Sequence, residues 1–218
     1  MKEAAALLAC LSMVGAFAWY VPLIVRRRVS PAPATWIIGA MAMNLAMLSY
    51  HAIPGRTFIE NATLYAAALE IVFVLAILMT ILWRAGELSV AFDHVQKACL
   101  AVMVAALAWW AFNQDQSYVT FWTTQTLLVV AYLATILKAL QLRTAFDSIG
   151  NWGLIFVGSV IGSVPAVAMT SPYGIANSVR PVVSSGITLS LLIWYDRLNG
   201  GARWKDEYRT LTKFYGFR

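Results

Sequence analysis

The fold is decided by the stretch WYVPLIVRRRVSPAPATW, residues 19–36, in which one apolar run ends, three arginines follow and a second apolar run begins. Basic residues collect in the short connections on the inner side of a membrane, so this order predicts a membrane helix, an inner connection and a second membrane helix. The chain is 61% hydrophobic with a mean hydropathy of +0.70, which leaves room for several further runs of this kind.

Seven apolar runs of membrane-crossing character can be marked along the chain. A helix needs about 20 mainly apolar residues to cross roughly 30 Å of hydrocarbon. Lipid offers the backbone no hydrogen-bond partners, so runs of this length are helices. The predicted fold class is therefore all-α, a polytopic membrane protein with seven transmembrane helices. The expected spans are Ala4–Val25, Ala34–Ala52, Ala62–Trp83, Ala98–Phe112, Ser117–Leu137, Trp152–Met169 and Ile175–Tyr195.

The basic residues predict the orientation. Thirteen of the 16 Lys and Arg residues fall on one side of this zigzag, and the opposite side keeps Lys2, Arg56 and Arg180. The N-terminus is therefore expected outside and the C-terminus in the cytoplasm, with a bacterial inner (plasma) membrane as the expected location. The net charge of +6 is explained by an anionic inner leaflet, so no nucleic-acid partner is expected.

The two ends of the chain resemble each other weakly. The residues around Tyr20 and Arg26 correspond in kind to those around Tyr132 and Lys138, and Thr35-Trp36 corresponds to Asn151-Trp152. Such repetition predicts three spans, a linker span and three more spans. The expected divisions are a first triple-helix bundle (residues 1–89), a linker helix (90–116), a second triple-helix bundle (117–196) and a cytoplasmic basic tail (197–218). In the tail, aromatic and basic residues recur at helical spacing, which predicts a short helix on the inner leaflet.

This organisation resembles the PQ-loop and SWEET-type transporters, which are built as two triple-helix bundles around an inversion linker. The resemblance is carried by a helix that ends in Pro22 and aliphatic residues, a basic connection with Ser30 and Pro31, and Thr35-Trp36 at the next helix. The chain departs from the family motif where Leu23, not glutamine, follows Pro22. The resemblance implies solute transport.

Glu70 and Arg180 are the charged candidates for chemistry inside the spans. An acid about nine residues into the third span is costly unless it faces protein or water, and desolvation would suit it to carry a proton. Arg180 comes at a similar depth in the seventh span and is the natural partner, although it could instead cap an outer connection, with Pro181 in the first turn of a shorter helix. His51, at the outer end of the second span, is a second candidate for proton coupling, and a solvated interfacial histidine is the alternative.

Polar residues and prolines complete the candidate site. Asn44, Gln125 and Asn177 are expected to line a solute cavity, or else to join helices by hydrogen bonds. Pro22, Pro165 and Pro181 are the candidate kink or gating positions. Gly158 and Gly162 predict close helix packing, and the tryptophans near span ends predict interfacial belts.

Enzyme chemistry is not expected. The sequence holds no HExxH, CxxC, Walker or GxSxG motif, so no cofactor and no metal site is predicted. The leading hypothesis is a secondary transporter or facilitator of a small polar solute, working by alternating access and open to proton coupling. The first alternative is a structural or accessory subunit of a larger membrane complex, and the second is an intramembrane enzyme acting on a lipid-linked substrate. The expected partners are membrane lipids, the solute and, left open, further copies of the chain or other subunits.

Overall fold

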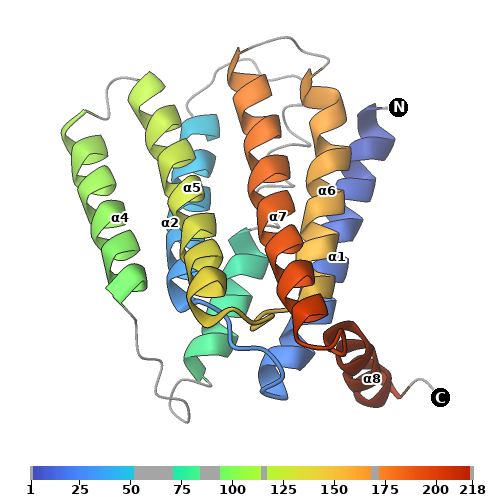
Figure 1. Ribbon diagram of the computed structural model, residues 1–218. Coiled ribbons are helices and arrows are strands. Elements are labelled where there is room, and N and C mark those ends of the chain that lie inside the picture. Colours follow the sequence, from blue (N-terminus) through green and yellow to red (C-terminus); the bar gives the residue numbers. More distant parts are fainter. Residues whose placement is uncertain (1, 52–70, 84–93, 114–116, 168–171, 217–218) are drawn as a thin grey trace.

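The computed structural model describes residues 2–51, 71–83, 94–113, 117–167 and 172–216, and this part of the chain is all helical (Figure 1). The helices are α1 (Lys2–Val25), α2 (Pro33–His51), the helix Ile71–Trp83, α4 (His94–Phe112), α5 (Ser117–Leu142), α6 (Ile149–Val167), α7 (Pro172–Leu198) and α8 (Arg203–Tyr215). Helices from α1 to α7 run alternately down and up in Figure 1, whereas α8 lies across one end.

Three of the described helices are long and apolar enough to cross a membrane. They are Leu7–Val25, His94–Phe112 and Val119–Leu142, with mean hydropathies of 2.0, 1.6 and 1.5, and Ile71–Trp83 and Ile149–Val164 are shorter apolar helices. Large apolar side chains on these helices are exposed, among them Leu7, Val104 and Trp109. Exposed apolar surface on this scale fits a lipid environment, so the protein is of the membrane class.

Several helices begin or end outside the apolar runs that predict them. α4 begins at His94 instead of Ala98, because Gln96 in its first turn is buried and contacts the start of α2. α5 continues to Leu142 instead of Leu137, with Lys138 bonded to a neighbouring connection. α7 begins at Pro172, in the helix position where proline is best tolerated.

One end of the bundle carries most of the described basic residues. The connections 26–32 and 143–148, the start of α4, the end of α7 and the whole of α8 lie at the bottom of Figure 1. We call this the basic end. Arg180 lies toward the opposite end, in the first half of α7.

The two stretches that resemble each other in sequence make corresponding contacts. The Tyr20 ring lies 5.4 Å from the Trp36 ring, and the Tyr132 ring lies 5.6 Å from the Trp152 ring. The first pair belongs to a core of α1, α2 and the helix Ile71–Trp83, and the second to a core of α5, α6 and α7. Each of these two apolar clusters thus draws on three helices and lies near the basic end.

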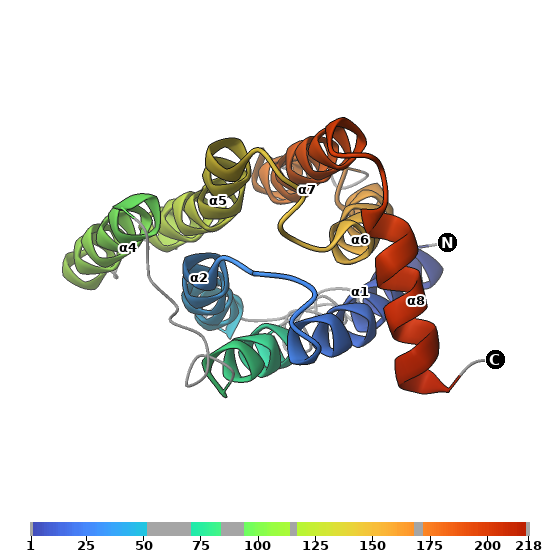
Figure 2. The ribbon, with the colours of Figure 1, turned by 60° about the horizontal axis from the view of Figure 1, so that its bottom comes forward.

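Contacts between the two groups follow the same correspondence. α1 packs most extensively against α6, and α2 against α5 (Figure 2). The glycines of α6 allow the first approach, because an added Cβ at Gly158 would lie 3.1 Å from the Ser12 Cβ, and one at Gly162 would lie 3.6 Å from the Ala9 Cβ. The predicted close packing at these glycines is confirmed.

α8 is anchored to α1 by aromatic side chains. Trp204 stacks on Trp19 with ring centroids 5.1 Å apart, and the Tyr215 hydroxyl donates to the Ala18 carbonyl at 2.7 Å. The Arg26 guanidinium lies over the Phe214 ring. The tail therefore forms a helix docked across the basic end (Figure 2).

Candidate functional site

Arg180 of α7 and Gln125 of α5, two residues expected to bind solute, lie against each other. Arg180 Nε donates to Gln125 Oε1 at 2.6 Å, and the Gln125 side chain is buried. Each residue stands eight positions after the first residue of its helix, Pro172 or Ser117, and so about 12 Å along that helix. The structure thus brings together two residues that are far apart in the sequence and lie at the same depth in their helices. Glu70, the partner expected for Arg180, lies outside the described residues.

The alternative interpretation of Arg180 as the cap of an outer connection is wrong. It required Pro181 in the first turn of a shorter helix, but α7 begins at Pro172 and Pro181 lies inside it. Ser185 Oγ donates to the Pro181 carbonyl within the same helix. A guanidinium this far into a 27-residue helix is costly in lipid unless it faces protein or water, and here it faces Gln125.

Polar side chains surround Gln125 on α5. Thr120, Thr123 and Thr124 are all buried. Trp110 Nε1 on α4 donates to Thr120 Oγ1 at 2.9 Å, and Thr124 Oγ1 donates to the Thr120 carbonyl. This part of α5 is consequently a polar wall inside an apolar bundle.

The other predicted site residues are not gathered here. Asn44 is exposed and donates to the Ala40 carbonyl of its own helix at 2.8 Å, and none of its described contacts reaches the Arg180–Gln125 pair. Pro22 is buried inside α1, and α6 runs through Pro165. The side chains of His51, Pro165 and Asn177 lie outside the described part of the structure, so the roles expected of them stay predictions.

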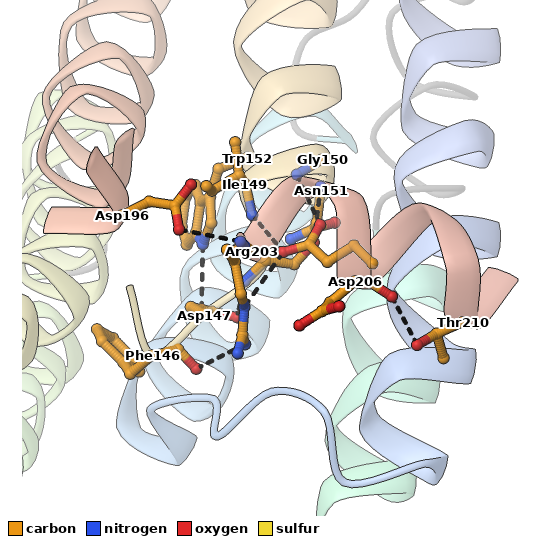
Figure 3. Close-up of polar contacts among 12 residues, drawn as sticks. Phe146, Asp147, Ile149, Gly150, Asn151, Trp152, Asp196, Arg203, Asp206 and Thr210 are labelled. Atoms are coloured by element: carbon orange, nitrogen blue, oxygen red, sulfur yellow. Dashed lines mark hydrogen bonds and ion pairs between the residues drawn. The ribbon is translucent and has the colours of Figure 1, made fainter. Parts of the chain in front are cut away.

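A second polar site lies at the basic end, around two buried carboxylates. Asp147 Oδ1 accepts hydrogen bonds from the Tyr20 hydroxyl at 2.7 Å and from the Ser148 amide at 2.8 Å. Asp147 Oδ2 accepts one from Trp152 Nε1 at 3.1 Å (Figure 3). Asp147 lies two residues before the first residue of α6, so its bond to Tyr20 fixes the start of that helix to α1. We call Asp147, Glu207 and the groups bonded to them the carboxylate cluster.

Glu207 of α8 caps the start of α6. Its carboxylate accepts the Ile149 and Gly150 amides at 3.0 and 3.1 Å, Ser148 Oγ at 2.9 Å and Trp19 Nε1 at 3.1 Å. The first amides of a helix lack partners within the helix and carry partial positive charge, so they suit an anion. Arg203, one turn earlier, lies 3.5 Å from the same carboxylate. Burial raises the pKa of Glu207 above its ordinary value, and the hydrogen bonds from Gly150, Trp19, Ser148 and Ile149 oppose that rise.

The first half of the chain repeats this arrangement with a neutral group. Gln96 Oε1 of α4 accepts the Ala34 amide at the start of α2 at 3.4 Å. Ala34 precedes Thr35 as Gly150 precedes Asn151, so the two caps occupy corresponding positions. Thus α4, which follows the first three helices, caps α2, and α8, which follows α5, α6 and α7, caps α6.

Hydrogen bonds also join the connections at the basic end. Lys138 Nζ donates to the Ser30 and Pro31 carbonyls at 2.7 and 3.2 Å, and the Ser30 amide donates to the Phe146 carbonyl at 3.0 Å. Arg203 Nη2 donates to the same carbonyl at 3.3 Å (Figure 3). These bonds tie residues 26–32, 143–148 and α8 into one unit.

Asn151 is the exception within this unit. Its side chain is 1% exposed, yet neither its amide nitrogen nor its amide oxygen has a hydrogen-bond partner among the described residues. In the first half, Thr35 stands at the position of Asn151, and its hydroxyl bonds the Thr135 hydroxyl at 2.7 Å. Asn151 lacks such a partner in the described part of the structure, because the residue that corresponds to Thr135 is the apolar Leu23. A buried amide left without partners costs about 1–3 kcal/mol, so Asn151 disfavours this arrangement of helices.

The sequence reasoning missed the carboxylate cluster. It assigned Trp19, Trp36 and Trp152 to interfacial belts, but Trp19 and Trp152 donate to carboxylates, and Trp36 and Trp152 are buried. Trp83, Trp109 and Trp194 are exposed, as a belt requires. One signal was available: Asp147-Ser148 before an apolar run is a helix-start pattern, and Ser148 Oγ does accept the Asn151 amide.

In comparisons with protein-family models, with curated proteins and with solved structures, nothing matches this chain.

Proposed function

We propose that this protein is a membrane transporter or facilitator that moves a small polar solute by alternating access, with Arg180 selecting a solute that carries negative charge. The observation that carries the proposal is the Arg180–Gln125 pair, a cation and an amide joined about 12 Å inside two neighbouring helices. Charged groups at such depth are rare in membrane helices and mark solute or ion pathways.

The arrangement of the two halves supports the same proposal. Transporters commonly consist of repeated units that rock against each other about a central site. Here corresponding Tyr–Trp pairs and corresponding helix caps recur in both halves, and the halves adjoin through α1–α6 and α2–α5. The bonds among the connections and α8 would hold the basic end shut in one of two states.

Counterflow into proteoliposomes tests the proposal. We would use radiolabelled succinate and glutamate as anionic probes and glucose as the neutral probe. Wild type is expected to take up an anionic probe saturably, and Arg180→Gln to abolish that uptake. Arg197→Gln is the matched control, because Arg197 is an exposed arginine near the other end of the same helix. Glu70→Gln tests proton coupling and is expected to remove the dependence of uptake on pH.

Two results would overturn the proposal. One is saturable uptake that Arg180→Gln leaves unchanged. The other is the absence of uptake for every probe, combined with a stoichiometric set of other subunits after gentle purification from native membranes. That second result would support the accessory-subunit alternative.

We propose that the basic end faces the cytoplasm of a bacterium, as basic residues near span ends favour. A fluorescent protein that folds only in the cytoplasm, fused after Arg218, is expected to fluoresce. The same fusion before Met1 is expected to stay dark, and the reverse pattern would contradict this orientation.

A further inference from the structure

The outward side of α8 separates aromatic from basic side chains. Successive residues turn by about 100° around a helix, so Trp204, Tyr208 and Tyr215 fall on one flank. Lys205, Arg209 and Lys213 fall on the next flank and are exposed. The third side, with Glu207 and Thr210, is buried against the bundle. This helix therefore has three distinct sides.

A groove of about 420 Å³ lies where the aromatic and basic flanks meet. It is lined by Trp204, Lys205, Tyr208, Arg209 and Thr212. The two cations and the Tyr208 hydroxyl can donate to phosphate oxygens, while the Trp204 and Tyr208 rings offer apolar walls. The Thr212 hydroxyl donates to the Arg209 carbonyl at 3.0 Å. Trp204 is held in place by its stacking on Trp19, so one wall of the groove is preorganised.

The charge and the position of α8 favour one kind of ligand. Residues 203–218 contain five Lys or Arg residues and two acids, and one of the acids, Glu207, is buried at the start of α6. Among the described residues of the segment, Lys205, Arg209 and Lys213 are exposed, as is one acid, Asp206, which lies 3.8 Å from Arg209. The outward surface of α8 therefore carries net positive charge. α8 lies across the ends of α1 and α6 at the edge of the bundle, where a surrounding leaflet would begin (Figure 2). Aromatic rings favour this interfacial layer, and clustered cations favour anionic headgroups.

We propose that the groove on α8 binds the phosphate of an anionic phospholipid in the adjoining leaflet, with Lys205 and Arg209 as the cations and Trp204 and Tyr208 against the glycerol and upper acyl region. This site is independent of solute transport. In this proposal α8 is a lipid-binding helix that Glu207 attaches to the bundle.

Nanodiscs and native mass spectrometry test the proposal. The full chain would be placed in nanodiscs of phosphatidylcholine mixed with phosphatidylglycerol, released into detergent and weighed with its retained lipids. Wild type is expected to retain phosphatidylglycerol in preference to phosphatidylcholine. Each of Lys205→Gln and Arg209→Gln is expected to weaken that retention by about fivefold. Lys97→Gln, at an exposed lysine of α4, removes the same charge away from α8 and is expected to change nothing.

Tyr208→Ser distinguishes a lipid from a free anion. A lipid site needs the aromatic wall, so this variant is expected to lower phosphatidylglycerol retention, and added inorganic phosphate is expected to compete poorly with the lipid. The proposal is overturned if the two lipids are retained equally, if Lys205→Gln and Arg209→Gln behave as Lys97→Gln does, or if inorganic phosphate displaces the lipid completely. Hydrogen exchange over α8 of each variant would verify that this helix stays folded.

Discussion

Glu207 reaches the start of α6 from 58 residues further along the chain. Most helix caps come from the residue just before the helix, and Ser148 fills that local role here. The carboxylate from α8 adds acceptors for the next two amides and for Trp19. At this scale a single side chain holds three helices together, so its loss should be felt far from its own helix.

Glu207→Gln should destabilise the basic end. The substitution replaces one accepting oxygen with a donor and leaves at least one of the four buried donors without an acceptor, at a cost of about 1–3 kcal/mol. Thermal unfolding in detergent and hydrogen exchange over α8 would measure the loss. Asp206→Asn is the control, since Asp206 is exposed beside it and makes only a long ion pair with Arg209 among its described side-chain contacts. Equal effects of the two substitutions would contradict the capping role.

The pH dependence of stability should show the titration of Glu207. Because burial raises the pKa of Glu207, the folded protein keeps this proton at pH values where the unfolded chain has released it. Stability should therefore fall as pH rises from the ordinary glutamate range through the raised pKa, and then level off. The neighbouring charged or titratable groups are Arg203 on α8, Tyr20 on α1 and Asp147 before α6. Subtracting the melting temperatures of Glu207→Gln from those of wild type across pH isolates the effect, and a difference that grows with pH would contradict it.

Gly150→Ala should be far more damaging than Gly153→Ala. An added Cβ at Gly150 would meet the Trp19 ring, including its Nε1, well inside contact distance, whereas nothing lies within 4 Å of one at Gly153. We expect Gly150→Ala to cost about 1–3 kcal/mol through overpacking. Gly153→Ala should be neutral or stabilising by up to about 1 kcal/mol, because alanine is the better helix former. Thermal unfolding of the two variants decides, and similar melting temperatures would refute the close approach of α6 to Trp19.

At the scale of the helices, hydropathy predicted the helical class and the approximate place of the described helices better than it predicted their ends. The apolar run that predicts a span at residues 98–112 stops short of the helix start at His94, where Gln96 is buried. The polar residues at these ends form tertiary contacts that no local pattern records. For the same reason the Arg180–Gln125 pair could be guessed only as two separate candidates, since nothing in the sequence says that α5 and α7 adjoin at that depth.

Thr35 and Thr135 offer a test of the α2–α5 pairing. Their hydroxyls are 2.7 Å apart and both side chains are buried. Thr35→Val alone should cost about 1–3 kcal/mol, because it leaves the Thr135 hydroxyl unsatisfied. The double variant Thr35→Val with Thr135→Val should recover most of that loss, since both polar groups are then removed together. A double-mutant cycle by thermal unfolding gives the coupling, and strictly additive losses would mean that the two hydroxyls do not interact.

At the scale of the whole molecule, the two halves make corresponding contacts but differ in polarity. The first half caps α2 with the neutral Gln96, and the second caps α6 with Glu207 and adds the buried Asp147. Thr35 has a hydroxyl partner, whereas Asn151 has none among the described residues. Under the proposed function the two halves rock between two states, and a group that is satisfied in one state and unsatisfied in the other would shift the population between them. Among the described residues, the buried side-chain atoms without a hydrogen-bond partner belong to Asn151 and Arg203, in the second half near α8.

Asn151→Leu should therefore stabilise the arrangement with α8 docked while impairing function. Leucine has nearly the shape of asparagine and removes two unsatisfied polar atoms, so a gain of about 1–3 kcal/mol is expected in thermal unfolding. If the amide finds partners only when the basic end opens, the same substitution biases the two-state equilibrium toward the shut state, and about 1.4 kcal/mol would lower the open population tenfold.

Counterflow should slow accordingly, and hydrogen exchange over α8 should fall. Asn113→Leu, beyond the end of α4 at the opposite side of the bundle, should change neither. A destabilised Asn151→Leu with unaltered exchange over α8 would mean that this amide is satisfied in the shut state after all.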